Sequence, residues 1–403
     1  MSSCPSKVSS SSLIFGAGVP KPVLTDEEIK LVRDGSNGVR GILPARFYTD
    51  PDIWKWEVEN VLKKNWLFVG PWDWAEKPGD YFTIEMFGEP LVITRDKEGE
   101  LHCLVNSCRH RWAKVAQEEK GNASVLVCPY HRWSYNLDGS LRAMSLESIQ
   151  GLDKKDCGLP QLRLELWNGL IFINFDKDAK PLAPQLAEAD KYIKNYGLSK
   201  FKFADKMPYE SDWNYKFSFE TGFEAYHHIG VHNERISEAM PPAAHRVIAS
   251  GELFTLYGQT GTQEMHEAGV YHPFGTPPWM DEQRAADRSY DAMYLGVYPS
   301  LICFIQPHQI SFITTQHKSV DRNQSASCIS IADWAHEVPN AQTLIANEVQ
   351  FMKDVQDEDT LACTSLQAGV RSSFNKQGYL HPKFEGWLHH YYEWWVNQIQ
   401  KEE

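Results

Sequence analysis

Four residues in the first half of the chain combine two side-chain types that commonly bind transition metals. Cys108 and His110 form one pair, and Cys128 and His131 form a second pair further along. Each pair offers one thiolate and one imidazole, and a single pair of this kind would mean little. Two matched pairs predict a metal site, and two chemistries fit them: a structural zinc ion or a [2Fe–2S] cluster.

The mixture of ligands within each pair favours the cluster over zinc. Zinc motifs usually pair Cys with Cys and His with His. Here each pair is mixed, which suits a cluster with both thiolates on one iron and both imidazoles on the other. Replacing two thiolates by neutral imidazoles also raises the reduction potential of such a cluster. The predicted cluster ligands are therefore Cys108, His110, Cys128 and His131.

A second candidate site lies near the middle of the chain, where Glu224, His227 and His232 follow one another closely. Two His and one carboxylate bind mononuclear iron in oxygenases and leave coordination positions open for O₂. Glu224 and His227 are three residues apart and would share a helical face. His227 and His232 are five apart, and Gly230 between them permits a turn that brings both imidazoles together. His228 is more typical of a packing residue or of a hydrogen-bond donor behind the ligands.

The remaining iron ligand must be a carboxylate far along the chain. A long helix is predicted at residues 340–370, and it contains four acidic residues close together: Asp354, Asp357, Glu358 and Asp359. Such a cluster is usually a solvated helix face. Apolar residues repeat along this helix at three- and four-residue steps, namely Met352, Val355, Ala362, Leu366 and Val370. Asp359 falls on this stripe, whereas Asp357 and Glu358 lie off it. Because a buried carboxylate is costly unless it is paired or bound to metal, Asp359 is the predicted third ligand.

The segments around both sites resemble those of a known enzyme family. NSCRHRWAKV (106–115) and CPYHRWSYNLDGSL (128–141) resemble Rieske sequences, except that Trp112 and Arg132 stand where that family most often has glycine. WNYKFSFETGFEAYHHIGVH (213–232) resembles the iron-binding segment of ring-hydroxylating oxygenases and their demethylase relatives, with Glu224 where many members have Asp. Asp359 precedes Gln367 by eight residues, as the acidic ligand does in this family. The chain thus resembles the catalytic (alpha) subunit of a Rieske-type non-haem iron oxygenase.

The resemblance implies an α+β protein with two domains. An all-β Rieske [2Fe–2S] domain is expected at residues 46–165, after a tail and lead-in at residues 1–45. A helix-grip catalytic domain is expected at residues 166–403, with an antiparallel sheet that wraps the long helix. Short β-type runs separated by Gly-rich turns from Gly79 onward agree with the first domain. Four predicted strands between Tyr294 and Ala332 agree with the second.

The same resemblance implies how the two metal sites cooperate. The family assembles head to tail as a homotrimer, so that the cluster of one subunit lies beside the iron of the next. Glu224 would then link His131 of one subunit to His227 of another, although an ordinary salt bridge is the alternative role for Glu224. The implied cofactors are a [2Fe–2S] cluster and mononuclear Fe(II). The implied partners are O₂, a small organic substrate, and an NAD(P)H-dependent reductase with or without a ferredoxin.

The sequence leaves three interpretations of the function open. An apolar pocket is expected from Phe217, Phe223 and the strands at 301–306 and 310–315, and it favours hydroxylation or dihydroxylation of a small aromatic compound. O- or N-demethylation is the alternative, including demethylation of a quaternary ammonium compound, because the many Trp and Tyr residues could form an aromatic cage. A Rieske electron carrier without turnover is a third interpretation, which the predicted iron ligands oppose.

Length, charge and composition indicate the number of domains, the kinds of partner and the location of the protein. A chain of 403 residues suggests two domains, and a formal net charge of −13 disfavours nucleic acid or an anionic membrane surface as partner. The polar, Ser-rich N-terminus lacks the apolar core of a secretory signal and is interpreted as a disordered tail. The eight cysteines show no disulfide spacing, which fits a reducing cytoplasm.

Overall fold

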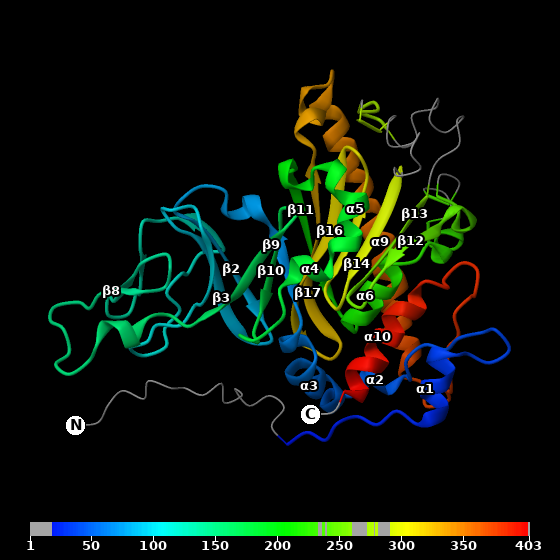
Figure 1. The fold of residues 1–403 in the computed structure, drawn as a ribbon, viewed down its shortest axis with the longest axis horizontal. Helices are drawn as coiled ribbons and strands as arrows, with labels where there is room; N and C mark the ends of the chain where they lie inside the picture. The colour runs from blue at the N-terminus through cyan, green and yellow to red at the C-terminus, as the bar shows by residue number, and fades with distance from the viewer. Residues whose placement is uncertain are drawn as a thin grey trace. The chain divides into compact units, whose positions relative to one another are not determined.

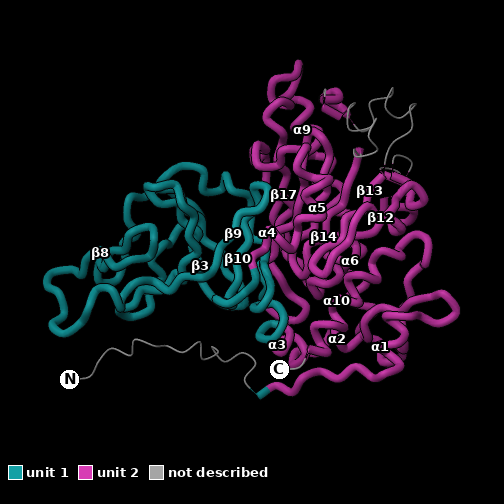
Figure 2. The backbone as a smooth tube through the Cα atoms, viewed as in Figure 1, with its two compact units in different colours: residues 1–18, 58–180, 316–318 teal, residues 19–57, 181–315, 319–403 magenta. Residues whose placement is uncertain are grey.

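The computed structural model describes residues 18–232, 236–237, 240–259, 272–277, 279–280 and 291–401. The Ser-rich N-terminal segment lies outside these residues. Two compact units divide the chain, one built mainly from residues 58–180 and the other from residues 19–57, 181–315 and 319–403 (Figure 2). The first unit extends past residue 165 because β10 (Leu170–Asn174) pairs with β9 (Gln161–Trp167) in its main sheet.

The first unit is an all-β structure, as the short β-type runs predict. Its main sheet has seven strands in the order β1-β10-β9-β4-β3-β2-β5, and a smaller sheet contains β6, β7 and β8. The other strands are β1 (Leu67–Pro71), β2 (Asp80–Met86), β3 (Glu89–Arg95), β4 (Leu101–Val105), β5 (Lys120–Asn122), β6 (Leu126–Val127), β7 (Ser134–Tyr135) and β8 (Leu141–Ala143). The turn between β2 and β3 consists of Phe87 and Gly88, both with positive φ, as a two-residue hairpin loop requires.

The second unit contains a seven-stranded sheet in the order β11-β17-β16-β15-β14-β13-β12, whose neighbouring strands run antiparallel (Figure 1). Its strands are β11 (Lys202–Ser211), β12 (Arg246–Ser250), β13 (Phe254–Gln259), β14 (Ala292–Val297), β15 (Leu301–Ile305), β16 (Gln309–Ser319) and β17 (Arg322–Ile331). Strands β14 to β17 correspond to the four predicted strands. The polar β11 and the strands β12 and β13 were not among the predicted elements.

Helices complete the second unit. They are α1 (Asp26–Arg33), α2 (Arg46–Thr49), α3 (Pro51–Asn60), α4 (Leu182–Gln185), α5 (Ala187–Ile193), α6 (Tyr215–Gly222), α9 (Ala341–Val370) and α10 (Leu388–Gln400). The predicted long helix is α9, which packs against β11, β17 and α6. Asn214 caps α6 by accepting a hydrogen bond from the Lys216 backbone N–H, and its own N–H donates to Gln367 of α9 at 2.8 Å. The start of α6 is therefore held against α9.

An aromatic contact joins α6 to the C-terminal helix α10, and a buried ion pair joins it to α3. Phe219 stacks on Tyr391, with ring centroids 4.2 Å apart. Lys216 forms an ion pair with Glu57 at 2.7 Å, and neither side chain is exposed. Because breaking a buried pair leaves an uncompensated charge, this contact ties α6 firmly to α3. In the described part of the chain, no helix is long and apolar enough to cross a membrane.

Candidate metal centres

Two loops with the same backbone pattern carry the four predicted cluster ligands. In the first loop the Trp112 N–H donates to the Cys108 carbonyl at 2.9 Å, and in the second the Arg132 N–H donates to the Cys128 carbonyl at 3.0 Å. Trp112 has a φ of 62° and Arg132 a φ of 63°. Each loop thus ends at a residue in the left-handed region, where glycine is the least strained residue. This is the physical reason for which glycine would be favoured at both positions.

The side chains on these loops converge. The rings of His110 and His131 lie 4.6 Å apart, and His110 stacks on Trp133 at 5.0 Å. Burial raises the pKa of the Cys128 thiol, and the neighbouring Cys108 sulfur raises it further. Cys108 Sγ also lies 3.2 Å from the hydroxyl of Tyr135.

One polar atom of this group indicates a ligand. Nδ1 of His110 is buried and has no hydrogen-bond partner in the structure described. Because a buried nitrogen is rarely left unbonded, a metal is the natural partner for this atom. Two neighbouring thiols and two neighbouring imidazoles fit a [2Fe–2S] cluster with mixed ligands.

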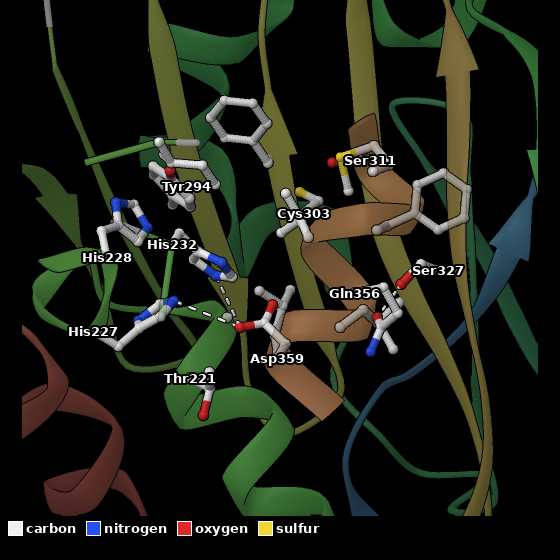
Figure 3. A pocket seen from close by; sticks show the side chains of 18 of the residues that line it. Thr221, His227, His228, His232, Tyr294, Cys303, Ser311, Ser327, Gln356 and Asp359 are labelled. Carbon is white, nitrogen blue, oxygen red and sulfur yellow. Dashed lines mark hydrogen bonds and ion pairs between the residues drawn. The ribbon is translucent and has the colours of Figure 1, made fainter. Parts of the chain in front are cut away.

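The second predicted site is assembled by α9 and by the segment that follows α6. Asp359 Oδ1 lies 3.0 Å from Nε2 of His232 and 3.7 Å from Nε2 of His227 (Figure 3). Ligand atoms of these three residues all lie within 4.8 Å of one another. Two imidazoles and one carboxylate around a shared point, with other directions open to a pocket, form the donor set that suits non-haem Fe(II).

The turn between His227 and His232 does not depend on Gly230, in contrast to the expectation from the sequence. Gly230 has a φ of −112°, which other residues adopt readily, so no glycine is needed there for the turn. The 3₁₀ helix η6 (Tyr226–Ile229) makes the turn instead. Glu224 begins it by accepting hydrogen bonds from the backbone N–H groups of Tyr226 and His227. This capping brings the two histidines toward one point.

Carboxylates also lie behind both imidazoles. Glu224 Oε1 is 2.5 Å from Nδ1 of His227, and Glu358 Oε2 is 2.6 Å from Nδ1 of His232. Burial lowers the pKa of His227, but the neighbouring Glu224 and Asp359 outweigh burial, so the pKa is raised overall. The helical phase of Glu358 had placed it off the predicted stripe, and its contact with His232 was not anticipated.

His228 has a different role from its two neighbours. Its Nδ1 lies 3.0 Å from the Met240 carbonyl oxygen, and burial lowers its pKa to about 3. It is therefore a neutral packing residue, in agreement with the sequence.

The residues buried on α9 are only partly those of the apolar stripe predicted from the sequence. Leu366 is 45% exposed, whereas the polar Gln356 and Gln367 are buried. Gln356 lies three residues before Asp359, and Cys363 lies four residues after it. Side chains at these spacings share one face of a helix, so Asp359 lies on this polar face. The buried side of α9 therefore accommodates hydrogen-bonding groups, and apolar periodicity described it incompletely.

A pocket opens beside the three convergent residues. It encloses about 770 Å³ of empty space, part of it open to solvent. Its walls come from the end of α6, the segment 224–232, β14 to β17, α9 and residues 236 and 240. The large apolar residues among them are Ile236, Met240, Ile302, Phe304, Phe312, Ile313, Phe351, Met352 and Val355. Strands β15 and β16 line the pocket as expected. Phe217 and Phe223 do not, because they pack on Tyr48 and Tyr257 instead.

Two family models match the chain around these two sites. Residues 65–151 match the Rieske [2Fe-2S] domain. Residues 198–401, just over half of the chain, match the catalytic domain of the ring hydroxylating alpha subunit. The chain belongs to the ring-hydroxylating alpha subunit family. The predicted family, the α+β fold class and the two cofactors, a [2Fe–2S] cluster and a mononuclear iron, are thereby confirmed.

Relatives of this ring-hydroxylating alpha subunit include two kinds of oxygenase. It is 34% identical to the benzene 1,2-dioxygenase alpha subunit of Pseudomonas putida, over 47% of this chain and 44% of that one. It is 31% identical to the glycine betaine monooxygenase oxygenase subunit of Pseudomonas aeruginosa, over 48% and 45%. The matched region thus spans less than half the length of these relatives. A solved quaternary ammonium Rieske monooxygenase shares the fold, with a TM-score of 0.78, 20% identity, and coverage of 95% of this chain and 100% of that one.

Proposed function

We propose that this chain is the oxygenase component of a Rieske non-haem iron system that uses O₂ to hydroxylate or dihydroxylate a small, neutral aromatic substrate. The observation that supports this most strongly is the convergence of His227, His232 and Asp359 beside an apolar pocket. A Rieske electron carrier would need neither feature. The activity therefore goes beyond electron transport.

The ligand assignments are part of this proposal. Cys108, His110, Cys128 and His131 hold the cluster, and His227, His232 and Asp359 hold the iron. When bound, the cluster supplies electrons and the iron supplies an open coordination position at which O₂ can react. The protein contributes orientation. Glu224 holds the His227 ring with its Nε2 toward Asp359, and the apolar pocket walls provide the surface on which a substrate would be oriented.

The charges of the pocket favour a neutral substrate. Among the described residues that line it, none is Lys or Arg, so a substrate carboxylate has no counterion there. The carboxylates among these described lining residues are Glu224 and Asp359, which are assigned to the metal site. Aromatic rings from Tyr294, Phe304 and Phe312 face the cavity and suit an apolar ring.

A quaternary ammonium substrate is the second candidate. The relative from Pseudomonas aeruginosa is a glycine betaine monooxygenase, and aromatic faces can bind a methylammonium group. The lack of a lining cation among the described residues counts against betaine-like compounds, which carry a carboxylate. A choline-like alcohol would not need that cation.

Assembly and partners complete the proposal. The chain acts as a homotrimer in which Glu224 links His131 of one subunit to His227 of the next, and an NAD(P)H-dependent reductase supplies the electrons, with or without a ferredoxin. The proposed location is a reducing cytoplasm, in which the Cys108 and Cys128 thiolates would stay available to the cluster.

Product analysis tests the proposal directly. The iron-loaded protein and a surrogate reductase are incubated with neutral arenes, aromatic acids, aryl methyl ethers, choline and glycine betaine. We expect hydroxylated or dihydroxylated products from neutral arenes. Formaldehyde release from choline or an ether, with arenes untouched, would favour the demethylase alternative. No product from any class, with only electron uptake by the cluster, would overturn the oxygenase assignment.

A further inference from the structure

We infer that Glu358 is a positioning residue for the iron site, holding His232 from behind as Glu224 holds His227. This inference rests on the proposed function, because it assumes that His232 binds iron. Glu358 Oε2 lies 2.6 Å from Nδ1 of His232, and the His232 side chain is only 1% exposed. The ring is therefore fixed within the protein and has little freedom to find another partner in water.

The contact determines which nitrogen of His232 is available to a metal. An ionised carboxylate can only accept hydrogen bonds, so Glu358 favours the tautomer whose proton is on Nδ1. The lone pair of Nε2 then points toward the side of the ring where Asp359 Oδ1 lies at 3.0 Å. A carboxylate behind the ring also makes the imidazole a more basic ligand.

The arrangement is repeated on the other imidazole. His227 has Glu224 behind Nδ1 at 2.5 Å and Asp359 in front of Nε2 at 3.7 Å. Three carboxylates thus surround two imidazoles, one between the rings and one behind each. This excess of negative charge favours a divalent cation at the centre.

Glu358 also affects the position of the third ligand. Glu358 and Asp359 are consecutive residues of α9, and they contact opposite nitrogens of the same ring. Holding Glu358 against His232 therefore fixes the rotation of α9 relative to the segment that carries both histidines. A second contact between α9 and the start of α6 lies about two helical turns further on, where Gln367 accepts a hydrogen bond from the Asn214 backbone N–H.

The test compares Glu358→Gln and Glu358→Ala with the matched control Asp357→Asn. Asp357 is exposed and lies one residue away, so its substitution removes the same charge from the same helix without touching His232. Binding of Fe(II) is measured by competition with a chelator, on protein whose Rieske cluster is intact by electron paramagnetic resonance. Removal of a group behind a ligand commonly weakens metal binding by roughly 10–100-fold.

We expect a loss of that size for Glu358→Ala, a smaller loss for Glu358→Gln, and none for Asp357→Asn. The midpoint of thermal unfolding of the iron-free proteins should agree within the series, which separates positioning of the ligand from a general loss of folding. Unchanged Fe(II) affinity in Glu358→Ala would overturn the inference. Complete loss in Glu358→Ala with full retention in Asp359→Ala would also overturn it, because Glu358 would then be the ligand itself. If the unsubstituted protein binds no Fe(II) beyond its cluster, the proposed function fails, and this outcome is distinct from both.

Discussion

Two residues in the loops that carry the predicted cluster ligands are held in a conformation that their side chains do not favour. Trp112 and Arg132 both have φ near +60°, and the Trp112 side chain is 82% exposed. A non-glycine residue in this region costs roughly 1–2 kcal/mol. Backbone strain of this kind concentrates at functional sites. The exposed Trp112 indole does not offset this strain by packing in the core of the subunit.

We predict that Trp112→Gly is more stable than Trp112→Ala by about 1 kcal/mol, because only glycine adopts the left-handed region without strain. The two variants lose the same exposed indole, so the difference isolates the backbone. Denaturant unfolding of both proteins measures it. Equal stabilities would show that the loop relaxes and stores no strain at Trp112.

Single substitutions can also test which carboxylate of α9 binds the iron. Asp359→Ala should empty the iron site and abolish oxygenation while leaving the cluster spectrum unchanged. Asp357→Ala should retain iron and most activity, because Asp357 is exposed and absent from the convergent group. Iron analysis and product formation measure both effects. The opposite pattern would contradict the assignment of Asp359.

At the scale of elements, α6 is held by buried polar contacts as well as by apolar packing. The Glu220 carboxylate of α6 lies 2.6 Å from the Tyr48 hydroxyl, and burial raises its pKa to about 8. Burial likewise raises the pKa of Glu57, the partner of Lys216, to about 7. Both groups lie in the unit that contains the iron site, and α6 immediately precedes Glu224. Their protonation therefore affects the element that leads into the site.

A pH dependence of stability follows for Glu220. Its folded-state pKa lies above the ordinary value of 4.5, so the native state keeps a proton that the unfolded state has lost. The contribution to stability is complete below about pH 4.5 and is lost as the pH rises toward 8. Glu220→Gln should therefore show a flatter stability profile than the unsubstituted protein over this range. Parallel profiles from denaturant unfolding would argue that Glu220 stays charged throughout.

At the scale of the whole molecule, the two metal sites belong to separate compact units of one chain. If electrons pass between subunits, a subunit without a cluster and a subunit without iron should complement each other. We predict partial activity when Cys108→Ser and His227→Ala chains are co-expressed, although each alone is inactive. Hetero-oligomers that contain both chains and remain wholly inactive would contradict transfer between subunits and the bridging role of Glu224.

The metal chemistry could be inferred from the sequence because its signals are local. Each Cys-His pair lies within one loop, and Glu224 and His227 are separated by one turn, so short-range geometry brings them together without knowledge of the fold. The long helix and strands β14 to β17 were also predicted, since their hydrophobic periods extend over many residues. The polar strand β11 was not predicted, because its burial alternates only weakly along the strand.

Contacts between distant segments were decided by the tertiary structure alone. Glu358 and His232 are 126 residues apart, and helical phase placed Glu358 off the apolar stripe. Phase shows which residues share a side of a helix, but it does not show which other segment approaches that side. Gln356 and Gln367 illustrate the same limit, because their burial on α9 depends on hydrogen-bond partners supplied by Ser327 and Asn214. Sequence periodicity records apolar burial, whereas polar burial depends on partners that only the folded chain brings into reach.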